Sequence, residues 1–123
     1  MIKQSPKEFP LRTVDIIVYP GFKALEAIGA MKVFDYANTH LRLRKLPGGY
    51  DVRIASTAIG PVESDTLMSL HASKALDASR LPDLAVIVGC HHVEQVLQDI
   101  PALAAWVAEA APRIDTLAAL CTG

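Results

Sequence analysis

The chain has 123 residues, of which 51% are hydrophobic, which is enough for one domain with its own core but small for a multilayered α/β fold. Its 12 basic and 13 acidic residues give a net charge of −1, so we expect no positive surface for nucleic acid. Two cysteines do not form a disulfide framework, no apolar run reaches membrane-spanning length, and the first dozen residues lack the apolar core of a signal peptide. These properties predict a cytoplasmic protein with no membrane partner.

Apolar runs and helical spacings alternate along the chain. The first predicted strand, 14–19, ends at Pro20-Gly21, and the predicted helix that follows ends at a Pro47-Gly48-Gly49 turn. Later segments predict strands at 50–56, 84–88 and 117–120, short hairpin strands within 59–75, and helices at 93–100 and 102–111. The buried face of the first helix is expected at apolar residues spaced three or four apart, namely Leu25, Ile28, Met31, Phe34, Ala37 and Leu41.

This order of elements predicts an open parallel sheet with helices on both faces, the α/β class of fold. No repeat or linker divides the chain, so we expect one domain over 13–123, preceded by a loosely ordered tail over 1–12. Functional groups in such sheets gather beyond the carboxyl ends of the central strands. We therefore expect three loops to converge, namely 20–26, 89–92 and the residues from Cys121 onward.

The last of these loops ends in a cysteine at a sharp turn. A predicted strand runs directly into Cys121-Thr122-Gly123, and small residues permit the strand-to-helix elbow that presents a nucleophile at the edge of an α/β sheet. A following helix would favour the thiolate through the positive end of its dipole. Because the sequence ends at Gly123, we expect the chain to carry half of such a site.

Glu26 and the residues after the third strand are candidate partners of Cys121. Glu26 is either a carboxyl group that orients the thiol and moves a proton, or an ordinary acidic residue in the first turn of a helix. His91 or His92 would serve as a general base for Cys121. Alternatively, Cys90 would resolve an oxidised Cys121 as a disulfide, or the two cysteines and one imidazole would bind a soft metal ion. The alternative is that His92 caps the next helix while His91 is solvated. Because no zinc-ligand spacing is present, we predict no metal.

Two conspicuous side chains are predicted to have no functional role. His71, between Leu70 and Ala72, is expected on the surface of a hairpin. Trp106, at helical spacing with Leu103 and Ala110, is expected in the core.

Taken together, the segments resemble the ThiJ/PfpI superfamily. VDIIVYPGF with ALEAIGAMKVFDYAN, LPDLAVIVG, PALAAWVAEAAPR and LAALCTG occur in the family's order and spacing over 13–123. The similarity is greatest to the amino-terminal domain of GlxA-like regulators of the AraC/XylS type, in which a class I glutamine-amidotransferase-like domain precedes a helix-turn-helix domain that binds DNA. The resemblance implies a flavodoxin-like fold, with Cys121 at the nucleophile elbow and Glu26 as its partner carboxylate.

The chain departs from this family pattern in two places. Members usually have Pro-Gly-Gly after the third strand, whereas this chain has Val88-Gly89-Cys90, so we expect a thiol side chain to replace one close backbone approach. Members also continue past the elbow with a helix, a Thr-His segment, further strands and, in the regulators, two helix-turn-helix motifs. We therefore expect a fold that is incomplete at its C-terminus. The chain would then be the product of a truncated reading frame, an expression fragment or a cleaved chain. An uncovered apolar edge at 117–120 predicts association, as a homodimer or with a complementary chain.

Two functions fit these features, and neither requires a cofactor. The first is the non-enzymatic, ligand-sensing or dimerising domain of an AraC-family transcriptional regulator, whose missing helix-turn-helix domain, rather than this segment, would bind DNA. The second is a small cysteine-dependent enzyme, a hydrolase, hydratase or glyoxalase-like protein, with Cys121 as nucleophile and Glu26 handling a proton. A small-molecule ligand of the first would contact Glu26, Gly89, Cys90, His91, Cys121 and Thr122.

Overall fold

The computed structural model describes residues 11–123, so most of the expected N-terminal tail lies outside the described residues. The described part alternates strands and helices in the predicted order. Its elements are β1 (Arg12–Ile17), α1 (Ala24–Leu43), β2 (Tyr50–Ser56), β3 (Gly60–Glu63), β4 (Ser69–Ala72), β5 (Lys74–Ala75), β6 (Leu84–Ile87), α2 (Val93–Asp99), α3 (Pro101–Ala110), a 3-10 turn (Ala111–Arg113) and β7 (Thr116–Ala119).

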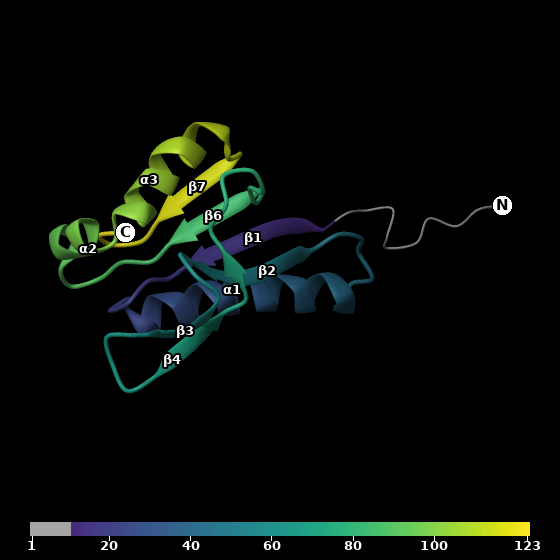
Figure 1. Ribbon diagram of the computed structural model, residues 1–123. Helices are drawn as coiled ribbons and strands as arrows, with labels where there is room; N and C mark the ends of the chain where they lie inside the picture. Colours follow the sequence, from purple (N-terminus) through teal and green to yellow (C-terminus); the bar gives the residue numbers. More distant parts are fainter. Residues whose placement is uncertain (1–10) are drawn as a thin grey trace.

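The main sheet has five parallel strands in the order β5-β2-β1-β6-β7, and β3 and β4 form a separate antiparallel hairpin. From β1 the chain crosses to β2 on one side, and from β6 it crosses to β7 on the other. Because such crossovers are right-handed, opposite directions place their helices on opposite faces. Figure 1 shows α1 on one face of the sheet and α3 on the other. The predicted α/β, flavodoxin-like class is confirmed.

The core is centred on β1 and its continuation. Val14, Ile16, Ile17 and Val18 are fully buried, as a strand in the middle of a sheet covered on both faces must be. Trp106 of α3 is buried with them, as predicted, while His71 is exposed on β4.

The buried face of α1 differs from the prediction at its first two turns. Leu25 is 84% exposed and Ile28 is 36% exposed, whereas Ala24 and Ala27 are buried. The alanine side chains allow the start of α1 to lie close against the core, which turns the larger neighbours outward. Farther along the helix, Met31 packs on the core as predicted. The expected face is therefore correct except in the turns nearest the converging loops.

The two edge strands also differ from expectation. The predicted strand at 117–120 is half-buried rather than buried, because β7 is the last strand on its side of the described sheet. At the opposite edge, β5 extends the sheet by two residues, and one of them is the lysine Lys74. A two-residue strand with a charged residue has no apolar run by which sequence could identify it.

One charged residue is buried in the middle of β1. Asp15 is fully buried, and its Oδ2 accepts a hydrogen bond of 2.6 Å from Nζ of Lys74. Arg53, its register partner on β2, places Nε 3.8 Å from Oδ1. A carboxylate removed from water requires such a counter-charge, so this pair fixes β5 against the centre of the sheet.

We expect Lys74→Met to destabilise the protein by about 3 kcal/mol, because it leaves a buried carboxylate without its hydrogen-bonded cation. Lys32→Met is the matched control: Lys32 contacts Asp35 at 2.8 Å on the surface of α1, and loss of such an exposed pair costs about 1 kcal/mol or less. Urea denaturation measures both free energies of unfolding. Equal losses in the two variants would contradict a structural role for the Asp15 pair.

Candidate functional site

The three loops predicted to converge do so at the carboxyl ends of β1, β6 and β7. Lys23 donates its backbone N–H to the carbonyl oxygen of Gly89 at 2.9 Å, and Phe22 forms a β-bridge with Cys90. Thr122, after β7, bonds the backbone of Cys90 in both directions: its Oγ1 donates to the carbonyl at 2.8 Å and accepts from the N–H at 3.2 Å. This is the point where the connections from β1 and β6 diverge, which is where open α/β sheets bind ligands.

Glu26 joins the start of α1 to the end of β6. Its Oε1 accepts a hydrogen bond of 2.7 Å from the backbone N–H of Gly89, and its Oε2 lies 3.9 Å from Nζ of Lys23. The carboxylate is therefore more than a helix-start residue, because it satisfies a backbone donor 63 positions away in the sequence.

Gly89 is the residue that faces the elbow. A Cβ at this position would lie 2.9 Å from Oε1 of Glu26, 3.0 Å from the carbonyl oxygen of Leu120 and 3.1 Å from Cβ of Cys121. The glycine that this chain keeps, Gly89, is therefore the one whose backbone lies close to the elbow. Cys90, the next residue, is buried beneath the loop instead.

Cys121 occupies a strained turn at the rim of the sheet. Its φ is 52°, in the left-handed region that non-glycine residues seldom adopt and that often marks a functional position. Its side chain is exposed, and Sγ lies 3.2 Å from Nζ of Lys23. This hydrogen bond, with the charge of Glu26 as a smaller contribution, raises the pKa of Lys23 and keeps the ammonium charged beside the sulfur.

Cys90 has a different environment from Cys121. It is 3% exposed and lies near Tyr19, whose hydroxyl donates a 2.6 Å hydrogen bond to the carbonyl oxygen of Val88. Burial first, and the Cys90 thiol second, raise the pKa of the Tyr19 hydroxyl. Both cysteines are free, one enclosed and one open to solvent.

The two histidines lie near their expected positions, but their side-chain contacts differ from the expectation. Nε2 of His91 lies 3.1 Å from Oδ2 of Asp65, so this imidazole is paired rather than simply solvated. Oδ1 of Asp65 accepts the N–H of Ala24 at 3.1 Å, and this bond, together with His91, lowers the pKa of Asp65. His92 occupies the N-cap position of α2, but its side chain makes no capping hydrogen bond.

Two residues of the site were not predicted. Lys23 contacts Cys121 from the loop before α1. Asp65, in the β3–β4 connection, contacts Ala24 at the start of α1 and His91 after β6. A lone lysine three residues before a glutamate has no distinctive spacing, and Asp65 lies in the hairpin region, which was not expected to approach this edge. Their roles depend on tertiary contacts that no local pattern encodes.

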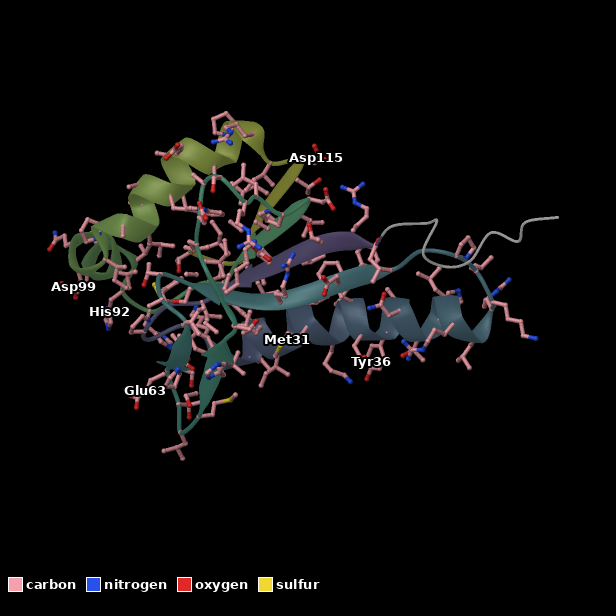
Figure 2. The ribbon with its side chains drawn as sticks, turned by 45° about the vertical axis from the view of Figure 1, so that its right-hand side comes forward. Met31, Tyr36, Glu63, His92, Asp99 and Asp115 are labelled. Atoms are coloured by element: carbon pink, nitrogen blue, oxygen red, sulfur yellow. The ribbon has the colours of Figure 1, made fainter. Side chains whose placement is uncertain are left out.

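The surroundings of the elbow are partly apolar. A hollow of about 510 Å³ extends from Thr122 and Gly123 across β6 and β7 toward the helices of that face, and its walls include Tyr19, Val96, Leu103 and Leu117. Figure 2 shows His92 and Asp99 at the same end of the molecule as α2, with Asp115 at the other end of β7. Polar groups at one end of an apolar hollow are typical of small-molecule sites.

Two further searches concern residues 11–123. Within this range, no group of three or more histidine, cysteine, aspartate or glutamate side chains is arranged to hold a metal ion. None of the helices there is long and apolar enough to cross a lipid bilayer.

Comparison with solved structures identifies the fold. No family model matches the sequence, and no curated protein matches it. Drosophila melanogaster DJ-1beta superimposes with a TM-score of 0.70 at 17% identity, over 92% of this chain and 56% of that one. A ThiJ/PfpI family protein from Pseudomonas syringae gives 0.67 at 16%, over 98% and 48%. An AraC family transcriptional regulator from Pseudomonas putida gives 0.55 at 22%, over 87% and 80%.

The structural neighbours are thus DJ-1/ThiJ/PfpI superfamily proteins, and an AraC-family regulator is among them. At these identities the likeness concerns the fold. The chain spans about half the length of the DJ-1 and ThiJ/PfpI structures, covering 56% and 48% of them.

We expect Gly89→Ala to destabilise the protein by about 1–3 kcal/mol, because the carbonyl of Leu120 is backbone and cannot move away as a flexible side chain can. Gly29→Ala provides the control, since a Cβ there meets nothing within 4 Å and alanine favours the α1 helix by about 0.5–1 kcal/mol. The free energies of unfolding in urea should change in opposite directions. A tolerated Gly89→Ala would contradict the close approach at the elbow.

Proposed function

We propose that this chain is the small-molecule-sensing domain of an AraC-type transcriptional regulator, and that it acts without catalysis. Its ligand would bind at the rim formed by the loops after β1, β6 and β7. The charged group of Lys23, the thiol of Cys121 and the hydroxyl of Thr122 would meet the polar part of the ligand. Its apolar part would occupy the hollow between β7 and the helices on that face.

The observation that carries this proposal is the partner of Cys121. Sγ is paired with an ammonium group at 3.2 Å, and among residues 11–123 no imidazole hydrogen-bonds to it. Nucleophilic catalysis by cysteine generally uses a neighbouring base that a third group orients. Here His91 pairs with Asp65, while one oxygen of Glu26 is committed to the backbone of Gly89. A site with a charged ammonium group and a strained cysteine, but with no free general base among the described residues, favours ligand binding over catalysis.

The likeness to an AraC family regulator supports the same assignment. The net charge of −1 is unsuited to DNA, so we propose that DNA contacts in such a regulator are made by another part of the protein, in the cytoplasm. The nucleotides downstream of codon 123 test this directly. We expect them to encode a helix-turn-helix region, and a gene without one would remove the regulator assignment.

A cysteine-dependent enzyme is the alternative, and one observation favours it. The φ of 52° at Cys121 and the adjacent ammonium group are features that would present and activate a thiolate nucleophile. In that case the thiolate would add to a carbonyl carbon of the substrate, and the oxyanion formed would take a proton from the ammonium group of Lys23, which lies beside Glu26.

The first experiment measures alkylation of Cys121 by iodoacetamide at neutral pH, followed by peptide mass spectrometry. We expect Lys23→Met to slow it about fivefold, because the variant removes the ammonium group that hydrogen-bonds Sγ. Lys32→Met, on the solvent side of α1, is the control and should leave the rate unchanged. Equal rates in wild type and Lys23→Met would refute the pairing of these side chains.

A second experiment separates sensing from catalysis. Wild type and Cys121→Ser are incubated with methylglyoxal, a reactive dicarbonyl, and lactate is measured. The sensing proposal predicts no difference between the two proteins. Lactate formation that is lost in Cys121→Ser would establish the enzyme instead.

We also propose that the chain forms a homodimer, the assembly usual for regulators that bind two half-sites on DNA. Large apolar side chains lie exposed along one side of α1: Leu25 is 84%, Val33 64% and Tyr36 66% exposed. Figure 2 shows Tyr36 on the side of α1 that faces away from the sheet. A stripe of this kind can bury itself against the same stripe of a second copy.

Sedimentation velocity tests the dimer. Val33→Glu should produce a monomer, because it places a charge in the middle of the α1 stripe, whereas Leu97→Glu on α2 should leave the dimer intact. If Leu97→Glu dissociates the dimer and Val33→Glu does not, the contact lies near β7, at the predicted edge. A wild-type chain that is monomeric at its highest soluble concentration would rule out self-association.

A further inference from the structure

A second hollow, separate from the elbow, lies beside the β2–β5 edge of the sheet. It measures about 430 Å³, and basic side chains from three segments line it: Arg53 from β2, Lys74 from β5 and Arg80 from the following loop. None of these residues contributes to the site around Cys121. The sheet therefore carries a concentration of positive charge that the proposed sensing function does not use.

The charges of this hollow do not cancel. Lys74 pairs at 2.6 Å with Asp15, which is fully buried, and this pair offsets the charge of the lysine. The remaining acid is Asp77, whose carboxylate accepts hydrogen bonds from the N–H and the hydroxyl of Ser79 at 2.9 and 2.7 Å. Arg53 and Arg80 thus leave an excess of one positive charge around the cavity.

The guanidinium groups of Arg53 and Arg80 have hydrogen-bond donors that no protein group uses. Within residues 11–123, neither side chain donates a hydrogen bond to a protein acceptor; Nε of Arg53 is buried and faces Asp15, which leaves the terminal nitrogens of this guanidinium group for a ligand. The nearest acceptor, the unpartnered Oδ1 of buried Asp15, is 3.8 Å from that Nε, which is too long for a hydrogen bond. Guanidinium forks match the paired oxygens of phosphate and carboxylate groups.

The hollow is held in shape by its own buried ion pair. Nζ of Lys74 donates to Asp15 and also to the backbone carbonyl of Arg80 at 3.1 Å, so one lysine joins β1, β5 and the loop that closes the cavity. An oxyanion entering here would meet donors already in position, which reduces the entropy lost on binding.

We propose that this hollow binds a small oxyanion, the phosphate or carboxylate group of a metabolite, held between the guanidinium groups of Arg53 and Arg80. This would be a second ligand site, on a different part of the sheet from Cys121. Binding there would bridge β2 and the loop after β5 and would stabilise the folded chain.

Isothermal titration calorimetry of the full chain with inorganic phosphate, and separately with acetate, tests the proposal at constant ionic strength. We expect saturable binding of at least one, and the stronger of the two identifies the preferred group. Arg80→Gln should weaken it about tenfold, because it removes a charged hydrogen-bond donor from an exposed position without disturbing the Asp15 pair. Arg113→Gln, an exposed arginine paired with Glu109 on α3, should change nothing.

Asp77→Asn should strengthen anion binding, a change that damage to the fold would not produce. It removes a negative charge from the hollow while the amide oxygen can still accept from Ser79, so the anion should bind about two- to fivefold more tightly. Cys121→Ser should bind like wild type, which separates this site from the sensing site. Absence of saturable heat with both anions, or equal affinity in wild type and Arg80→Gln, would overturn the proposal.

Discussion

The hydrogen bond from the backbone N–H of Gly89 to Glu26 is the interaction on which the site depends. It joins α1 to the loop that follows β6 at 2.7 Å, beside the turn that carries Cys121. A Cβ at Gly89 would lie 3.0 Å from the carbonyl oxygen of Leu120 and 3.1 Å from Cβ of Cys121, so a larger residue there would require this turn to shift. The geometry of the elbow, and therefore the access of Lys23 to the sulfur, follows from this one close approach.

The arrangement of the sheet explains why distant residues meet there. Parallel strands bring the loops after β1, β6 and β7 to one edge, and the connections that leave β1 and β6 in opposite directions open a crevice between them. Binding energy can then come from two sources, a charged rim and an apolar hollow beside it. The charged residues at the opposite side of β1 form a separate assembly around buried Asp15, where we propose a second ligand of different chemistry.

The central strands and the convergence of the loops could be predicted from the sequence, for different physical reasons. Buried strands such as β1 are encoded by continuous β-branched runs, and the convergence of the loops follows from alternation of strands and helices. The first turn of α1 could not be predicted, because tight packing selects Ala24 and Ala27 over larger neighbours, and periodicity alone does not rank them by size. Lys23 could not be found either, since a long flexible side chain reaches Cys121 only through the tertiary fold. The burial of Asp15 was missed because its cation is on β5, a strand of two residues.

Amide hydrogen exchange at Gly89, followed by NMR in wild type and in Glu26→Ala, tests the central claim most directly. If the carboxylate of Glu26 holds this N–H, the amide exchanges slowly in the wild type and much faster in the variant, while amides in β1 keep their protection. A Gly89 amide that exchanges at the rate of an unfolded peptide, or one whose protection is the same in both proteins, would contradict the account.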